Sequence, residues 1–476
     1  MEPDPRRWQA LAIVCVAFFM TVLDVSIVNV ALPSIARNLH FSATGLQWVI
    51  TAYAITFGGF LLLGGRVADI AGRKRMFLVG VVVFSAASLV CGLATSTGML
   101  ISARAVQGLG AAIVSPSTLS IITTTFDEGA ERNKALGIWG AMGGSGAAAG
   151  VLFGGILTKY AGWEWIFFVN VPVGALVLVL APRVVRESRA PGERQGFDIV
   201  GASAVTAGLA LLVYAISKAP VDGWGDSLTI GLLLAAAALV AFFLVWESRV
   251  ARPLMPLSIF RIRTLAAANV VGVLLGASVF ANFFLLTLYV QNVLHYSALK
   301  TGVTFLATAG TTVVVAALAQ WLTTRIGPRI VMTLGLALST GGLVWYAQIP
   351  VHGTYVHDLL PGYLLVGFGL ALSFIPVSIA ALAGVGPRDA GLASGLLNTS
   401  QQVGGAIGVA IASSVAVSHA THLLHTGSSQ AAALTSGYAL AFWVVAGVSA
   451  AAAVVALGFV RDSEVVMEEE PVEAFG

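Results

Sequence analysis

Apolar stretches of about 20 residues recur along the whole chain, and they constrain its fold more than any other feature. A helix needs about 20 consecutive apolar residues to cross the hydrocarbon core of a bilayer. The chain has 476 residues, of which 58% are hydrophobic and 10% are charged, whereas a soluble domain usually carries about 25% charged residues. A soluble core cannot bury so much apolar surface. The sequence therefore predicts an all-α integral membrane protein.

The spacing of these stretches predicts about fourteen membrane spans. The first six lie near 10–32, 46–66, 76–96, 99–124, 135–158 and 163–182. Two further spans lie near 198–217 and 227–247, and the last six lie near 265–290, 301–322, 330–349, 358–384, 391–417 and 434–460. This order indicates two related six-helix halves with an inserted pair of helices.

The same division gives the predicted domain organisation. Residues 1–182 form the first half, residues 183–264 hold two basic linkers and the inserted pair, and residues 265–460 form the second half. Residues 461–476 are predicted to be a disordered acidic tail. The loop at 65–74 has a weak counterpart at 325–329, and this internal echo is expected of two related halves.

The basic residues predict the orientation, because Lys and Arg near helix ends are retained in the cytoplasm. One set of alternate loops, together with both termini, holds most of them, including the runs at 73–75, 183–194 and 249–263. The other set offers only Arg37, Lys159, Lys218 and Lys300. We therefore expect an even number of spans in a bacterial cytoplasmic membrane, with both termini cytoplasmic.

Charge and motifs argue against several classes of function. A formal charge of +3, with basic residues in short loops, does not suggest nucleic-acid binding. Cys15 and Cys91 have no neighbouring Cys or His that would make a metal or redox motif. The sequence contains no HExxH zinc motif, no phosphate-binding P-loop and no GxSxG motif. We expect no cofactor, no metal and no enzymatic activity, with the proton-motive force as the energy source.

Asp24 is the first candidate for chemistry, because it lies inside the first predicted span. A carboxylate in hydrocarbon costs about 2.5–3.5 kcal/mol on insertion scales, so an intramembrane carboxylate suggests a functional site. It could take up and release a proton during transport. The alternative is a structural carboxylate that is hydrogen-bonded to a neighbouring helix.

Arg104 and Gln107 are three residues apart in the fourth predicted span, so they share one helix face. Arg104 could be a buried cation that faces a partner carboxylate or a proton path. It could also be an anchor whose charged end reaches the membrane interface.

The fifth predicted span is rich in glycine. Gly146, Gly150 and Gly154 are spaced by four and form a groove in which another helix can pack closely. The groove could serve packing alone, or it could be a sliding interface in a transport cycle.

Uncharged polar residues within other spans predict a substrate cavity. In the span at 391–417, Asn398, Gln401, Gln402 and Gly405 follow the spacing of one helix face. Such groups either bond a neighbouring helix or line a cavity. The predicted cavity residues are Asn29, Tyr53, Gln107, Asn282, Tyr289, Asn398 and Gln402.

Six segments, taken in order, resemble motifs of the major facilitator superfamily and of its fourteen-helix drug:proton antiporter branch, the multidrug exporters of the QacA and EmrB kind. These segments are 23–33, 65–75, 104–110, 140–155, 163–172 and 394–404. The chain departs from the pattern at Val151, where the antiporter motif usually has Pro, and at Glu164, where a basic residue is usual.

The resemblance implies roles for individual residues. Asp24 and Arg104 would be the proton-coupling pair. A cytoplasmic gate would comprise Gly65, Asp69, Gly72 and Arg73. The antiporter-motif helix would present Gly146, Gly150, Gly154 and Gly155.

These features together predict a monomeric secondary transporter in the lipid bilayer that exports small lipophilic or cationic molecules, such as antibiotics, in exchange for protons. The two halves would rock about a cavity near the membrane midplane. The alternatives are proton-coupled uptake of a nutrient and a membrane-embedded lipid transferase.

Overall fold

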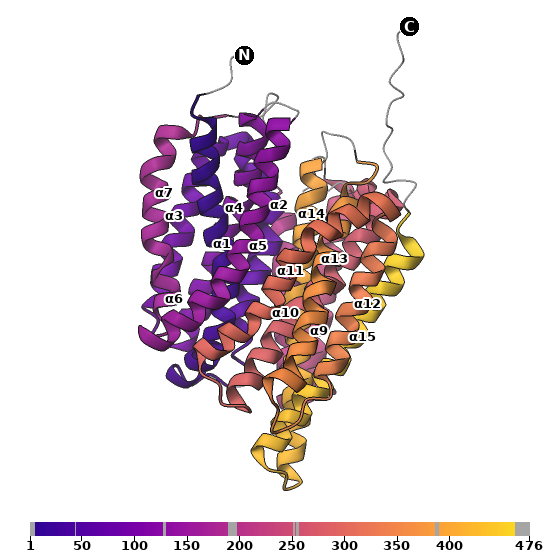
Figure 1. Ribbon diagram of the computed structural model, residues 1–476. Coiled ribbons are helices and arrows are strands. Elements are labelled where there is room, and N and C mark those ends of the chain that lie inside the picture. The colour runs from indigo at the N-terminus through magenta and orange to yellow at the C-terminus, as the bar shows by residue number, and fades with distance from the viewer. Residues whose placement is uncertain are drawn as a thin grey trace.

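The computed structural model describes residues 5–42, 44–126, 130–188, 198–250, 253, 257–385 and 390–461. All regular structure in these ranges is helical (Figure 1). Twelve helices in the described ranges are long and apolar enough to cross a membrane. The prediction of an all-α membrane protein is therefore confirmed.

The first bundle is built from consecutive helices that run up and down. They are α1 (Arg7–Asn38), α2 (Trp48–Ala71), α3 (Arg73–Gly92), α4 (Thr97–Thr125), α5 (Ala130–Tyr160), the short α6 (Trp165–Phe168) and α7 (Asn170–Val184). Two helices follow, α8 (Ile199–Asp222) and α9 (Ser227–Arg249).

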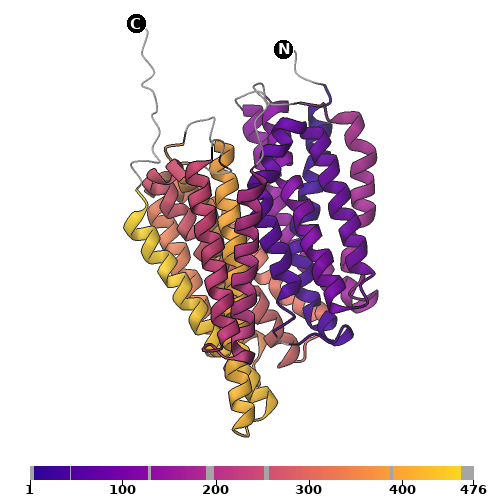
Figure 2. The same ribbon diagram turned by 180° about the vertical axis from the view of Figure 1, so that it is seen from behind.

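The second bundle follows the short helix η1 (Leu257–Arg261). Its helices are α10 (Arg263–Asn292), α11 (Ala298–Ile326), α12 (Pro328–Tyr346), η2 (Tyr355–Leu359), α13 (Leu360–Leu382), α14 (Ala390–His425) and α15 (Gln430–Phe459). The two bundles lie side by side, and α1 and α15 have their terminal ends at the same end of the molecule (Figures 1 and 2).

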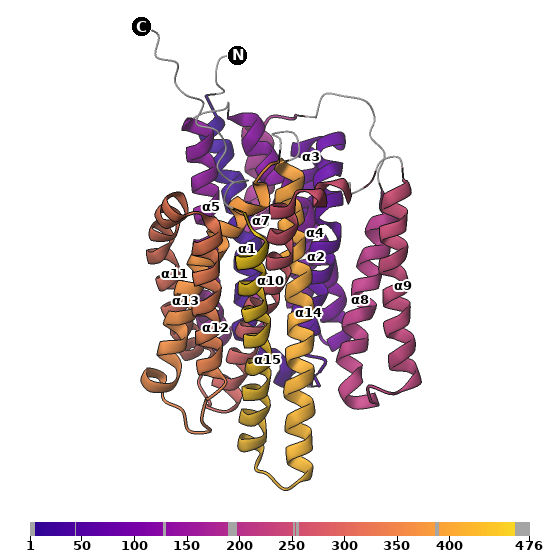
Figure 3. The ribbon, with the colours of Figure 1, turned by 90° about the vertical axis from the view of Figure 1, so that its right-hand side faces the viewer.

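The α8–α9 pair stands outside both bundles (Figure 3). Helix α8 contacts α2 and α14, and the apolar contact joins Ile55 of α2, Val213 of α8 and Ala406 of α14. The pair thus covers one junction between the two bundles.

The bundles also contact each other directly, toward the end opposite the termini. Gln291 of α10 donates a hydrogen bond to the Val30 carbonyl of α1, with an N–O distance of 2.7 Å. Residues of both bundles, among them Ile27 and Phe284, belong to one apolar core. The two bundles are therefore packed together at this end.

Corresponding loops of the two bundles turn in the same way. The chain passes from α2 to α3 through Gly72 at φ 114°, and from α11 to α12 through Gly327 at φ 83°. L-residues with a side chain rarely adopt such angles, so glycine is needed for both turns. The weak sequence echo between the halves thus corresponds to a shared backbone feature.

Candidate functional site

A buried ion pair between α1 and α4 is the centre of the candidate site. Asp24 lies near the middle of α1, and Arg104 lies two turns into α4, which begins after the capping residue Ser96. The Arg104 Nη1 atom is 2.6 Å from Asp24 Oδ2, and the two side chains are 2% and 0% exposed. Arg104 is therefore a buried cation facing a carboxylate, not an anchor at the membrane surface.

The second carboxylate oxygen of Asp24, Oδ1, accepts hydrogen bonds from two further donors. Gln107 donates from Nε2 to Asp24 Oδ1 at 2.8 Å, and its own Oε1 accepts from Arg104 Nη1 at 2.6 Å. Asn170, the first residue of α7, donates to the same Oδ1 at 2.9 Å and to Ser88 Oγ of α3 at 3.0 Å. Ser88 in turn donates to the Phe167 carbonyl at 2.9 Å. The network therefore joins α1, α3, α4 and the α6–α7 segment.

Helix α2 closes the other side of the arginine. Arg104 Nε donates to the Val49 carbonyl at 2.9 Å, and its guanidinium carbon lies 4.4 Å from the centre of the Tyr53 ring. A cation over an aromatic face is stabilised by the ring quadrupole. The buried Tyr53 hydroxyl has no hydrogen-bond partner among the described residues, which leaves it available to a ligand or a water.

This arrangement is suited to coupling the protonation of Asp24 to the positions of α1 and α4. A buried ion pair is stable only while both partners are present, and removal of one partner typically costs about 3–5 kcal/mol. Protonation of Asp24 would therefore weaken its hold on Arg104 and favour a rearrangement of the helices that carry the two groups. Such a coupling of protonation to helix position is what a proton-driven transporter needs.

The predicted gate residues lie in the last two turns of α2 and at the α2–α3 turn. A Cβ at Gly65 would lie 3.2 Å from Pro116 Cβ of α4, so this glycine permits close packing of α2 on α4. The Arg73 backbone N–H donates to the Ser188 carbonyl at 3.0 Å. The side chain of Asp69 lies outside the described part of the structure. Its predicted pairing with Arg73 therefore stays a prediction.

Sequence analysis did not identify Glu187, which contacts the same turn. Its carboxylate accepts hydrogen bonds from the backbone N–H groups of Lys74 and Arg75, both at 3.1 Å. A carboxylate at this place satisfies free donors and opposes the positive end of the α3 dipole. A Cβ at Gly72 would approach this carboxylate to 2.7 Å. Glu187 thus fixes the turn that contains the predicted gate.

The glycines of α5 face two different neighbours. Cβ atoms at Gly150 and Gly154 would lie 2.7 Å and 2.8 Å from backbone oxygens of α1, and Gly146 also faces α1. A Cβ at Gly155 would lie 2.8 Å from the Ala298 carbonyl oxygen of α11. The first three glycines therefore permit packing within the first bundle, and Gly155 permits contact between the bundles.

The remaining predicted cavity residues do not join the Asp24 network. Asn29 donates to the Val25 carbonyl and Asn398 to the Ser394 carbonyl, each within its own helix. Tyr289 donates to the Pro350 carbonyl at 2.7 Å. The side-chain oxygens of Asn282 and Gln402 are buried and have no partner among the described residues. Of the seven predicted residues, Tyr53 and Gln107 are the ones that contact the ion pair.

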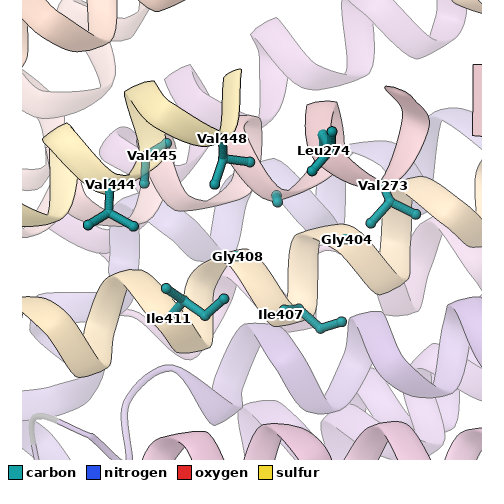
Figure 4. A pocket seen from close by; sticks show the side chains of 10 residues that line it. Val273, Leu274, Gly404, Ile407, Gly408, Ile411, Val444, Val445 and Val448 are labelled. Atoms are coloured by element: carbon teal, nitrogen blue, oxygen red, sulfur yellow. The ribbon is translucent and has the colours of Figure 1, made fainter. Parts of the chain in front are cut away.

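A small apolar cavity of about 120 Å³ lies in the second bundle, between α10, α14 and α15 (Figure 4). Its lining residues are Val273, Leu274, Ala277, Gly404, Ile407, Gly408, Ile411, Val444, Val445 and Val448. None of these can donate or accept a side-chain hydrogen bond or take up a proton. The cavity therefore offers no chemistry comparable to that of the ion pair.

The sequence profile of the Major Facilitator Superfamily matches residues 14–409. The chain belongs to this superfamily. The ion pair, the α8–α9 pair and most of both bundles lie within the matched segment. This superfamily member is thus a transporter of small-molecule substrates and not an enzyme, as the sequence predicted.

Several characterised superfamily members are similar over most of their length. The puromycin resistance protein pur8 of Streptomyces alboniger is 40% identical over 461 residues, which cover 95% of this chain and 91% of that protein. The cephamycin export protein CmcT of Amycolatopsis lactamdurans is 40% identical, with coverages of 84% and 83%. The tetracenomycin C resistance and export protein of Streptomyces glaucescens is 35% identical, with coverages of 85% and 75%.

Solved structures share the superfamily fold at low sequence identity. A bacterial homologue of the human lysosomal transporter Spinster, in an inward-facing and unoccupied conformation, has a TM-score of 0.69 at 14% identity, covering 95% of this chain and 97% of that chain. The POT family transporter PepTSo also has a TM-score of 0.69, at 16% identity, covering 94% of this chain and 97% of that chain. These likenesses establish the fold.

Proposed function

We propose that this superfamily member exports small lipophilic or cationic antibiotics in exchange for protons. The observation that carries the proposal is the buried Asp24–Arg104 pair, which gives the first bundle a titratable group at the middle of a membrane helix. The resistance and export functions in the names of the similar proteins support the direction of transport and the class of substrate. The protein works as a monomer and takes its energy from the proton gradient, without a cofactor.

The protein crosses the bacterial cytoplasmic membrane fourteen times. Helices α2 and α5 supplement the twelve long apolar helices, because each contains a shorter described apolar stretch, Trp48–Leu61 or Ala148–Tyr160. An even number of spans agrees with terminal helix ends at one end of the molecule (Figure 1). The many basic residues at this end favour a cytoplasmic location for both termini.

Residues 1–182 and 265–460 are the two moving halves, and residues 183–264 carry the inserted helices. The halves contact each other through Gln291 and Val30 at the end away from the termini. In the proposed orientation this end is the outer one, so the described conformation is closed to the outside. Substrate would then enter from the cytoplasm or the inner leaflet.

The transport cycle begins with substrate entry into the closed-outside conformation. In the form of this conformation in which Asp24 is protonated, substrate binding near Tyr53 promotes loss of the proton to the cytoplasm, and the carboxylate then pairs with Arg104 as in the described structure. Opening to the outside releases substrate and lets a proton reach Asp24. Protonated, neutral Asp24 no longer forms the ion pair with Arg104, and the two halves return to the closed-outside conformation. Each cycle thus exchanges substrate for at least one proton.

The other predicted site residues have supporting roles in this proposal. Gly65, Asp69, Gly72 and Arg73 form the cytoplasmic gate, and Gly146, Gly150, Gly154 and Gly155 let α5 slide against its neighbours. The substrate cavity is lined by Asn29, Tyr53, Gln107, Asn282, Tyr289, Asn398 and Gln402. The unpartnered oxygens of Asn282 and Gln402 are the polar atoms with which a bound substrate would form hydrogen bonds.

Uptake of puromycin into everted membrane vesicles tests the direction of transport. Such vesicles expose the cytoplasmic face, so an exporter accumulates its substrate inside them when the interior is acidic. We expect acid-dependent accumulation with the wild-type protein and none with vesicles lacking it. Accumulation only when the vesicle interior is alkaline would instead establish proton-coupled uptake into the cell.

A further inference from the structure

A basic cavity of about 530 Å³ lies at the end of the first bundle that carries the N-terminus, away from the Asp24 network. It is formed where α1 begins, where α3 begins and where α7 ends. Its charged lining residues are Arg6, Lys74, Arg183, Arg186 and Glu187. Four cations and one carboxylate give these residues a formal charge of +3.

Backbone contacts orient the cations of this cavity. Lys74 Nζ donates to the Pro182 carbonyl at 2.8 Å, and Arg183 donates to the Val179 carbonyl. Carbonyl oxygens hold these side chains in place without neutralising their charge. The carboxylate of Glu187 is already engaged by the backbone N–H groups of Lys74 and Arg75. Lys74 and Arg183 are therefore held at the cavity with their positive charges retained.

An apolar strip runs from this cavity into the membrane. Helices α3 and α7 contact each other and are both candidate membrane spans. Their outward residues Val79, Val82, Leu176 and Val179 are 41–55% exposed. Val179 lies one helical turn from Arg183, so apolar surface suited to acyl chains begins directly beside the cations.

We propose that this cavity binds the phosphate headgroup of an anionic diacyl phospholipid whose acyl chains lie along α3 and α7. Basic pockets between membrane helices at the bilayer surface fit anionic headgroups. The positive-inside rule explains why basic residues are abundant at this end. It does not require residues from three separate helices to line one cavity. The site thus ties the ends of α1, α3 and α7 to one lipid.

Binding of short-chain lipids to the purified, delipidated protein tests this proposal. Dioctanoyl phosphatidylglycerol is titrated in neutral detergent, and bound lipid is counted by native mass spectrometry. Dioctanoyl phosphatidylcholine has the same tails without net charge, and glycerol phosphate has the anionic group without tails. We expect saturable binding of one phosphatidylglycerol, with much weaker binding of the other two.

Charge-neutral variants locate the site. Each Lys or Arg near a membrane surface contributes about 1 kcal/mol to anionic-lipid binding, which is about fivefold in affinity. The double variant Lys74→Gln/Arg183→Gln should therefore bind phosphatidylglycerol about 30-fold more weakly. The matched control Arg263→Gln/Arg325→Gln removes two charges from the second bundle and should bind like the wild type. Elution as a single monodisperse peak verifies that each variant is folded.

Three results would overturn the proposal. One is wild-type affinity in Lys74→Gln/Arg183→Gln, and another is an equal loss in the Arg263→Gln/Arg325→Gln control, since either would mean that charge at this cavity is not decisive. The third is glycerol phosphate binding as tightly as phosphatidylglycerol, which would assign the cavity to a free phosphate ester. These measurements of lipid binding do not depend on transport, so the lipid site can be disproved without disproving the proposed export function.

Discussion

The guanidinium of Arg104 and the carboxylate of Asp24 meet at 2.6 Å, and neither side chain is more than 2% exposed. Each residue comes from a different helix, so the contact links α1 to α4 at the middle of the first bundle. Gln107 and Asn170 donate hydrogen bonds to Asp24, and Asn170 also donates to Ser88. Arg104 donates to the Gln107 side chain and to the Val49 carbonyl. We therefore expect the positions of α1 and α4 to depend on the charge of the Asp24 carboxyl group.

Neutralising one partner should destabilise the protein more than neutralising both. Asp24→Asn leaves Arg104 as an unpaired buried cation, at a cost of about 3–5 kcal/mol. Asp24→Asn/Arg104→Gln removes both charges and should recover much of this loss. Thermal unfolding in detergent measures the difference. A double variant less stable than Asp24→Asn would show that the pair is not the source of the penalty.

Loss of the Asn170 side chain should lower the stability of the protein more than loss of the Asn29 side chain. Asn170→Leu removes a donor to the charged Asp24 carboxylate, and such bonds contribute about 1.5–3 kcal/mol. Asn29→Leu is a matched control on α1, because Asn29 bonds only to a backbone carbonyl in its own helix, a bond worth about 0.5–1.5 kcal/mol. Denaturation midpoints compare the two. Equal losses would argue against a special role of Asn170.

Gly155 should be needed for contact between the bundles, whereas Gly140 should not. A Cβ at Gly155 would press on the backbone of Ala298 and Leu299, both at 2.8 Å, whereas a Cβ at Gly140 has nothing within 4 Å. Gly155→Ala should raise hydrogen exchange at 298–302 and reduce transport. Gly140→Ala should be neutral or stabilise α5 by about 0.5–1 kcal/mol. Unchanged exchange in Gly155→Ala would contradict the close contact.

The contact between Glu131 and Arg7 should weaken in acid. Glu131 lies at the start of α5, outside the predicted span at 135–158, and its hydrogen bond from Arg7 lowers the pKa of its carboxyl below the ordinary value. The stabilisation is present above the unfolded-state pKa and is lost as the pH falls through the lower folded-state value. The protection factor of the first turn of α5, which corrects the hydrogen-exchange rate for its intrinsic pH dependence, should therefore fall in acid in the wild type. Glu131→Gln should show a low protection factor at all pH values, and a pH response like that of the wild type would refute the assignment.

The sequence predicted the apolar helices and the candidate residues Asp24 and Arg104 because these depend on local signals. The length of each apolar stretch predicts a helix, and Asp24 could be identified because it is a charged residue inside such a stretch. Arg104 and Gln107 have helical spacing, so their common face could be predicted. That this face meets Asp24 depends on tertiary packing, which spacing alone does not encode.

Asn170, Ser88 and Glu187 were not predicted as site residues for the same reason. Asn170 lies at the break between α6 and α7, where the sequence has no helical periodicity from which the orientation of its side chain could be predicted. Ser88 is one of many small polar residues in membrane helices, and most of these serve packing. Glu187 follows Arg183 and Arg186 and contacts a turn more than 110 residues earlier in the chain. Its role depends on the α2–α3 turn reaching the end of α7.

Proton release on substrate binding is the most direct test of Asp24 as the coupling group. Puromycin is added to purified protein in weakly buffered detergent solution, and the pH is recorded. The wild type should release protons as it binds puromycin, and Asp24→Asn/Arg104→Gln should bind puromycin without releasing a proton. Release of the same amount by this double variant would contradict the account.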